Sequence, residues 1–262
     1  MACPMDDPMA EVARYPLTGR FLLGRLRDAM SDAEKATLEG LVERTEWLDR
    51  PTRIIGRGER ATHSTMLIDG FMLRTLDGNG RRYSVSFHVP GDFVDLHCYA
   101  LKRLDHNLDT VGRVKVGYVP HSALDRVIDE QPHLARLVWF STLLDAALHR
   151  EWIVTLEQLT TPRRLAHIFA EIGRRLTMVG LGEPTGFDTP FTQSDLSEMA
   201  GATPIHVNRA IQTLRQVGVA DFDRGRITIT DRDALEAYAG FTPDYLYGPW
   251  SLAYRHEAGD PI

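Results

Sequence analysis

Residues 192–216 constrain the fold most, because their capping residues and apolar spacing define two short helices joined by a tight turn. Thr192 and Asp195 form a capping box, so a helix begins there. Gly201 can end this helix in the left-handed conformation that a sharp turn requires. Thr203 then caps a second helix that has Pro204 at its first position. The segment is therefore predicted to be a helix-turn-helix.

The second of these helices has one apolar and one polar face. Val207, Ile211 and Leu214 recur at helical spacing and should pack on the first helix. Arginine on the other face can bind guanine, asparagine or glutamine can bind adenine, and an apolar side chain can contact a thymine methyl group. We therefore predict that this helix reads DNA, although an ordinary helical hairpin would show the same pattern. The predicted DNA contacts in this segment are Thr203, Pro204, Ile205, Asn208, Arg209 and Gln212.

A short hairpin is predicted directly after this helix. Strand-like runs at 219–222 and 227–230 flank the turn residues 223–226. A hairpin in this position is the wing of a winged helix-turn-helix, and Arg224 and Arg226 at its tip suit contacts with DNA phosphates.

The N-terminal half has the strand period instead. Runs at 54–55, 64–68, 71–76, 83–88 and 114–119 are separated by glycine-rich turns, and residues 77–80 suggest a hairpin. Short strands at such regular spacing predict a small barrel or β-roll over about residues 48–120.

A long helix is predicted between Pro132 and Leu159, about 40 Å in length. Its apolar residues follow a spacing close to that of a coiled coil, which predicts pairing with the same helix of a second chain. A helix buried within one domain is the alternative. The predicted dimerisation residues are Leu137, Ser141, Leu144, Leu148 and Trp152.

Composition narrows the function classes. The chain has 262 residues, 43% of them hydrophobic, which favours two domains with real cores. It has neither a signal pattern nor a run of about 18 apolar residues, so we expect a soluble cytoplasmic protein with no membrane association. Cys3 and Cys98 are too few for a cysteine-bound iron–sulfur cluster. The net charge of −6 argues against nonspecific coating of nucleic acid but allows a local basic face.

Short motifs occur in a fixed order from about Gly40 to Phe241. They are Gly58-Glu59, Asp69-Gly70, Pro90-Gly91-Asp92-Phe93, Pro162-Arg163-Arg164-Leu165, Thr192-Gln193 with Asp195-Leu196, and Val207 with Arg209. Together with the long helix, this order resembles the cyclic-AMP receptor/fumarate-nitrate regulator (Crp/Fnr) family of bacterial transcription factors. The resemblance implies an α+β fold in which a cyclic-nucleotide-binding-like jelly roll senses an effector and a winged helix-turn-helix binds DNA.

The resemblance also implies a homodimer on a pseudo-palindromic operator, with Arg209 matching the base-reading arginine of the family and Asn208 a neighbouring DNA contact. RNA polymerase and a small-molecule effector are candidate partners. The expected domains are an N-terminal arm (1–30), the sensor roll (31–130), the dimerisation helix (131–160), the winged helix-turn-helix domain (161–240) and an aromatic tail docked on folded surface (241–262). Most of residues 1–20 is expected to be flexible or loosely docked. Residues 180–190 are expected to be a flexible connector.

This sequence departs from the family pattern where cyclic-nucleotide-binding members carry a glutamate and an Arg-Ser pair. Leu96 and His106-Asn107 stand there instead, so we predict that cyclic AMP is not the effector. Pro204 and Ile205 also depart from the usual base-reading residues, which suggests an operator sequence of its own. The candidate effector-pocket residues are Phe93, Asp95, Leu96, His97, Cys98, His106 and Asn107.

The identity of the signal stays open at this point. The histidines and Cys98 in this stretch suit haem or a metal ion, but structural roles are the commoner use of such residues, and a small molecule or no soluble effector are alternatives. We expect no resident cofactor or metal and no catalytic residues. A cupin-like metal-dependent enzyme, with His63, His88 and His97 as ligands, is the competing hypothesis. It leaves the C-terminal half unexplained, so we expect that the protein is not an enzyme.

Overall fold

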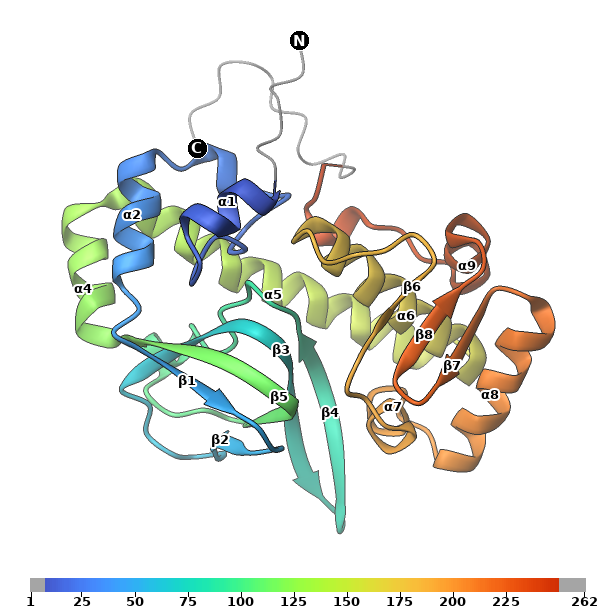
Figure 1. The fold of residues 1–262 in the computed structure, drawn as a ribbon. Helices are drawn as coiled ribbons and strands as arrows, with labels where there is room; N and C mark the ends of the chain where they lie inside the picture. The colour runs from blue at the N-terminus through green and yellow to red at the C-terminus, as the bar shows by residue number, and fades with distance from the viewer. Residues whose placement is uncertain (1–7, 250–262) are drawn as a thin grey trace.

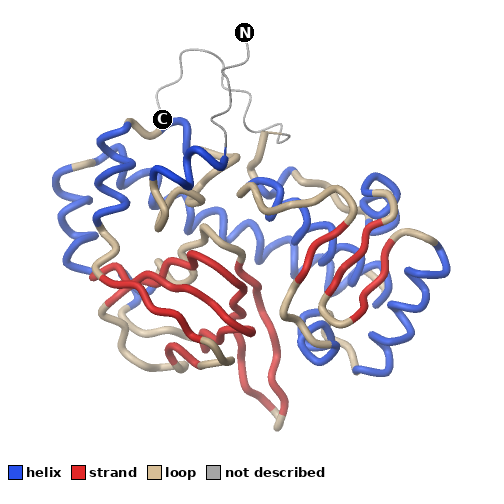
Figure 2. The backbone as a smooth tube through the Cα atoms, viewed as in Figure 1, coloured by secondary structure: helices blue, strands red, loops and turns tan. Residues whose placement is uncertain are grey.

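The computed structural model describes residues 8–249 and has two units connected by one long helix. An antiparallel sheet with several helices forms the N-terminal unit, and a helical unit with a small sheet forms the C-terminal one (Figure 1). Helix α5 (Pro132–Gln158) passes behind both units. Figure 2 shows the strands gathered into two separate sheets, one in each unit. The predicted α+β class and the order of the elements are confirmed.

The N-terminal sheet is fully antiparallel. Its strand order is β1-β5-β3-β4, with β2 also paired to β5. The bounds are β1 (Arg44–Leu48), β2 (Arg53–Ile55), β3 (His63–Gly78), β4 (Arg81–His88) and β5 (Asn107–Pro120). The runs predicted at 64–68 and 71–76 are one strand, because a register shift around Asp69 and Gly70 bends β3 without ending it. The hairpin predicted at 77–80 connects β3 to β4.

The N-terminal segment packs on the roll, so the flexible or loosely docked arm predicted for most of residues 1–20 is wrong for residues 8–20. Helix α1 (Pro8–Arg14) and a 3-10 turn η1 (Arg27–Ala29) lie here, and helix α2 (Asp32–Gly40) follows. Phe21 and Leu22 are buried in the same cluster as roll residues. Arg27 is fully buried, with its Nε 2.7 Å from the Glu11 carboxylate. Residues 15–26 between α1 and η1 are turns and so lack helical or strand periodicity, yet their apolar side chains enter the core.

Three helices follow or interrupt the roll: α3 (Cys98–Leu101), α4 (His121–Glu130) and the 27-residue α5. The face of α5 predicted to pair with a second chain lies inside its own chain. Leu137, Leu144, Leu148 and Trp152 are buried in the intramolecular cores, and Ser141 is half-buried. The predicted dimerisation face is therefore wrong.

Helix α5 has a second apolar stripe on its exposed side. Trp139, Leu143 and Ile153 are 62%, 52% and 64% exposed. They fall in the series Arg136, Trp139, Leu143, Ala146, Arg150, Ile153 and Glu157, which alternates steps of three and four residues. We call this series the outer α5 face. The helix is apolar on two sides, and spacing alone cannot tell which side its own domain covers.

The C-terminal unit matches the predicted order of a winged helix-turn-helix. Its helices are α6 (Thr161–Met178), α7 (Gln193–Met199), α8 (Pro204–Val217) and α9 (Arg232–Ala239), and its sheet order is β6-β8-β7. The strands are β6 (Gly186–Asp188), β7 (Ala220–Asp223) and β8 (Arg226–Ile229). Residues 186–188 pair with β8, so the flexible connector predicted for 180–190 is wrong in that part.

The hydrophobic core is continuous between the two units. The ring of Phe71 in β3 lies 5.2 Å from that of Phe191 ahead of α7, and Phe87 in β4 lies 5.8 Å from Trp152 in α5. The roll, α5 and the C-terminal unit are therefore packed as one body in this structure.

The start of the aromatic tail docks on α5 and α6, as predicted. Phe241 is buried. A 3-10 turn η2 (Asp244–Leu246) follows, and the hydroxyl of its Tyr245 donates to the Glu171 carboxylate of α6 at 2.9 Å. Tyr247 packs edge-to-face on Phe140 of α5. Trp250 and Tyr254 lie outside the described residues.

Candidate nucleic-acid interface and sensing residues

The two helices of the helix-turn-helix are capped as the sequence predicts. The Thr192 backbone N–H donates to the Asp195 carboxylate at 2.8 Å, and the Asp195 N–H donates to the Thr192 hydroxyl at 3.2 Å. Gly201 has a φ of 59°, which lets the chain turn sharply after α7. The Thr203 hydroxyl accepts from the His206 N–H at 3.3 Å and so caps α8. These bonds fix where α8 starts.

The inner face of α8 holds the helix against α7. Val207, Ile211 and Leu214 are buried with Leu196 and Met199 of α7 in the shared core. This packing leaves the opposite face of α8 at the surface and sets its orientation.

The outer face of α8 carries the predicted base-reading residues. Ile205 is 66% exposed, and Asn208, Arg209 and Gln212 are also exposed. The Gln212 amide donates to the Asn208 side-chain oxygen at 3.1 Å, which keeps these two amides side by side. Arg209 makes no ion pair with any described residue. Its guanidinium is therefore available to a ligand.

His206 is an exposed residue of this helix that sequence reasoning missed. It lies one turn or less from Ile205 and Arg209, and its ring Nδ1 is 3.1 Å from the Thr203 hydroxyl. The available signal was its place in the first turn, where side chains of a recognition helix reach the bases.

The wing is present, but its two arginines differ. Arg224 lies exposed in the β7–β8 turn with a φ of 46° and has no ion pair with a described residue. Arg226 is half-buried at the start of β8, with its guanidinium 3.1 Å from both Glu183 and Asp188. Arg224 is thus free to bind a phosphate, whereas Arg226 is already neutralised, contrary to the prediction of two tip arginines.

The β3–β4 hairpin contacts the helix-turn-helix directly. The Arg82 guanidinium lies 2.7 Å from the Glu198 carboxylate and 2.9 Å from that of Asp195. A groove between hairpin and helix-turn-helix is lined by Arg81 and Tyr83 on one side and by Thr203, Pro204 and His206 on the other. The start of α8 therefore faces the roll of its own chain.

The candidate effector-pocket residues do not line one pocket. Phe93 packs edge-to-face on Phe21, with ring centroids 5.3 Å apart, and Leu96 joins the same core cluster. The Asp95 carboxylate accepts from the Thr65 hydroxyl at 3.0 Å, and burial raises its pKa to about 6. These three side chains have structural roles in the roll.

Cys98 and Asn107 are also engaged within the chain. The Cys98 thiol is buried 3.4 Å from His121 Nε2, and burial raises its pKa to about 12, so it stays protonated. The Asn107 side chain accepts from the Arg57 N–H at 2.9 Å and donates to Asp77 at 3.0 Å.

His97 and His106 are the two candidates that the structure brings together. Their ring centroids lie 5.2 Å apart. Burial lowers the pKa of both, that of His97 to about 3, so both imidazoles are neutral near pH 7. His97 also lines an apolar groove of the roll with Leu101, Ile128 of α4 and Trp139 of α5.

The ligand set of the competing enzyme hypothesis does not form. Among the described residues, the group with metal-ligand spacing is His97, Asp105 and His106. His88 instead lies 3.2 Å from the Asp92 carboxylate, and His63 contacts Thr62. The cupin-like arrangement of His63, His88 and His97 is therefore wrong.

Comparison with known proteins gives the same assignment as the geometry. Residues 163–238 match the Crp-like helix-turn-helix domain. A probable transcriptional activator of Rhizobium leguminosarum bv. viciae is 28% identical over 188 residues, covering 70% of this chain and 76% of the relative. The transcriptional activator protein FnrL of Cereibacter sphaeroides is 26% identical over 225 residues, covering 82% and 88%.

Solved structures share the fold. That of FixK2 from Bradyrhizobium japonicum superposes with a TM-score of 0.67 at 21% identity, covering 76% of this chain and 98% of that one. Across residues 8–249, none of the helices has the length and apolar character needed to span a bilayer. With the capped recognition helix, the wing and the roll in this order, the chain has a Crp-like helix-turn-helix domain at residues 163–238 and is similar over most of its length to transcription regulators of the Crp/Fnr type.

Proposed function

We propose that this DNA-binding regulator acts as a homodimer on a pseudo-palindromic operator, and that its roll responds to a signal other than cyclic AMP. The observation that carries the DNA-binding role is the outer face of α8, where Ile205, Asn208, Arg209 and Gln212 are exposed on a helix fixed by its cap. The exposed Arg224 of the wing adds a phosphate contact beside it. Apolar, amide and guanidinium groups on one short helix are the chemistry that reads base edges in a major groove.

The dimer we propose forms through the outer α5 face. Its large apolar side chains, Trp139, Leu143 and Ile153, are each more than half exposed, which a monomer in water would not favour. Their alternating spacing of three and four residues suits a coiled coil with a second copy of α5. A two-fold axis along these helices would present two copies of α8 to successive major grooves, about 34 Å apart.

The chemistry of the roll argues against cyclic AMP. Leu96 is buried and apolar where a ribose-binding carboxylate would be needed. The buried cation of this region, Arg74, is bound to the Asp145 carboxylate at 2.6 Å and to the Val94 carbonyl at 2.9 Å. This buried guanidinium is thus already committed to a carboxylate, and burying a phosphate without a free cation beside it is costly.

The remaining parts of the proposal follow from the regulatory role. We place the protein in the cytoplasm, where it meets DNA, and assign it no enzymatic activity. RNA polymerase is its further partner, because a bound regulator alters transcription by acting on polymerase. Transcription in vitro from a selected operator, with and without the protein, tests that contact.

The decisive experiment selects genomic fragments bound by the purified full-length protein and derives the shared motif. We expect a motif with two-fold symmetry whose half-sites lie about one helical turn apart. Light scattering of the protein, free and bound, should give two chains per site. Failure to enrich any sequence would refute specific DNA binding, and a motif without symmetry would refute the dimer. Repeating the selection with cell extract tests whether a soluble effector is needed.

A further inference from the structure

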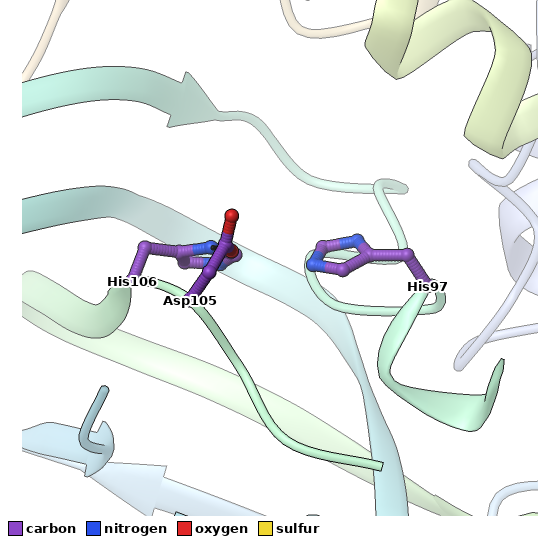
Figure 3. A group of neighbouring side chains, drawn as sticks. All are labelled: His97, Asp105 and His106. Atoms are coloured by element: carbon purple, nitrogen blue, oxygen red, sulfur yellow. Dashed lines mark hydrogen bonds and ion pairs between the residues drawn. The ribbon is translucent and has the colours of Figure 1, made fainter. Parts of the chain in front are cut away.

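Two histidine rings and one carboxylate meet between the start of α3 and the start of β5. His97 immediately precedes α3, and Asp105 and His106 immediately precede β5. Figure 3 shows the His97 ring directed toward the other two side chains, which approach from the opposite side. One nitrogen of each ring and one Asp105 carboxylate oxygen lie within 4.8 Å of one another. Residues that precede two different elements thus converge on one point.

The hydrogen bonding of the two rings is incomplete. His106 is 6% exposed, and its Nδ1 lies 2.7 Å from the Asp105 carboxylate, to which it donates. This leaves the lone pair on Nε2, a buried atom with no partner among the described residues. The ring of His97 likewise has no hydrogen bond to a described residue. A buried imidazole nitrogen without a partner is unfavourable, so a ligand at this point would stabilise the site.

The donor set identifies the chemical class of that ligand. Two imidazoles and one carboxylate form the set that holds divalent first-row transition metals and leaves coordination positions open. Ligand atoms bound to one such ion lie about 3–4 Å apart, given metal–ligand bonds of about 2.0–2.2 Å. The Asp105 side chain is 83% exposed, so it can release its hydrogen bond to His106 Nδ1 and swing to the ion, and the half-buried His97 can shift toward it.

We propose that His97, Asp105 and His106 bind one divalent transition-metal ion. The site lies in the roll, and His97 connects it to the apolar groove that α5 closes with Trp139. The ion therefore sits next to the helix whose outer face we assign to dimerisation. Metal binding itself does not depend on that assignment or on DNA binding.

The test is a titration of tag-free, metal-free full-length protein with Zn²⁺ by calorimetry and with Co²⁺ by visible absorption, in the absence of DNA. We expect one ion per chain and Co²⁺ bands typical of nitrogen and oxygen ligands. His97→Gln and His106→Gln should each weaken binding by at least about 100-fold, and Asp105→Asn by about 10- to 100-fold. Circular dichroism checks that the variant at buried His106 folds. If that variant does not fold, the Zn²⁺ affinity of the variant at half-buried His97 decides the test.

His121→Gln is the matched control, because His121 is another half-buried histidine of the same unit and lies beside Cys98. It should bind Zn²⁺ with unchanged affinity. The proposal is overturned if the wild-type protein binds no stoichiometric ion, if His97→Gln and Asp105→Asn bind as tightly as the wild type, or if His121→Gln abolishes binding while His97→Gln keeps it. Operator binding is measured separately, so a failure of the metal site and a failure of the DNA-binding function are distinguishable.

Discussion

Arg82 of the β3–β4 hairpin forms an ion pair with Glu198 of α7, with its Nε 2.7 Å from the carboxylate. Side chains of the roll and of the helix-turn-helix are thus joined directly, beside the continuous apolar core. Arg82 is 35% exposed and Glu198 16%, so solvent screens the pair only in part. The same guanidinium reaches Asp195, whose carboxylate also caps α7. Any change at this contact bears on how α7 and α8 are held.

Replacing Arg82 with glutamine should loosen α7 against the roll. The variant leaves Glu198 without its cation, and we expect a loss of about 1 kcal/mol in the free energy of unfolding, since the pair is partly exposed. Amide hydrogen exchange in α7 should become faster. Arg81→Gln is the matched control, because Arg81 is exposed and has no ion pair with a described residue. Equal exchange rates in the two variants would show that the ion pair does not hold α7.

Replacing Arg209 with alanine should remove a base contact. On the selected operator we expect a loss of about 1–3 kcal/mol, measured by fluorescence anisotropy, and a relaxed preference at one base position in each half-site. The exposed, unpaired guanidinium is the reason for this expectation. If affinity falls equally for all DNA sequences, Arg209 contacts phosphate and not a base.

Replacing Arg224 with alanine should weaken binding to every DNA sequence by a similar factor. Loss of one phosphate contact should also reduce the slope of log affinity against log salt by about 1 for each wing. Arg226→Ala is the control within the same hairpin, because two carboxylates already neutralise Arg226. A change in base preference in Arg224→Ala, or an equal salt effect in Arg226→Ala, would contradict the roles given to these residues.

A double change of Leu143 and Ile153 to glutamate should produce folded monomers. Both side chains are exposed on the outer α5 face, so the charges disrupt a chain-to-chain contact and leave the intramolecular core intact. Light scattering gives the mass and circular dichroism the fold. Val217→Glu, at an equally exposed apolar position outside α5, should remain dimeric. A dimer that persists in the double variant would exclude the outer α5 face as the interface.

Lowering the pH from 7 to 5 should reduce the free energy of unfolding, and part of that loss should come from His167. This α6 side chain is 2% exposed, and burial lowers its pKa from 6.5 to about 4. As the pH drops below 6.5 the unfolded chain takes up the proton first, so native stability declines between pH 6.5 and 4. Between pH 7 and 5 this contribution amounts to about 2 kcal/mol. Urea unfolding of His167→Gln should show a correspondingly shallower pH dependence, and an unchanged dependence would refute the assignment to His167.

The local signals in the sequence predicted much of the DNA-binding unit. The capping pairs at Thr192 and Thr203 fixed both helix starts, and the spacing of Val207, Ile211 and Leu214 gave the buried face of α8. Each of these features depends on residues within a turn or two of one another. Such short-range chemistry does not need the rest of the fold.

The errors involve contacts between distant parts of the chain. The sequence could not show that Phe21 enters the core of the roll, or that Arg226 meets Glu183 and Asp188, because these partners are far apart along the chain. It could not show which apolar side of α5 its own domain covers, since both sides have helical spacing.

The sequence by itself thus determined that residues 192–216 form two capped helices with a DNA-reading face, since capping and periodicity act locally. Only the tertiary structure decided which side of α5 stays free and which of the clustered histidines meet. His97 precedes α3 and His106 precedes β5, and the chain between them folds back so that the two rings meet, a local path that no helical or strand spacing reports.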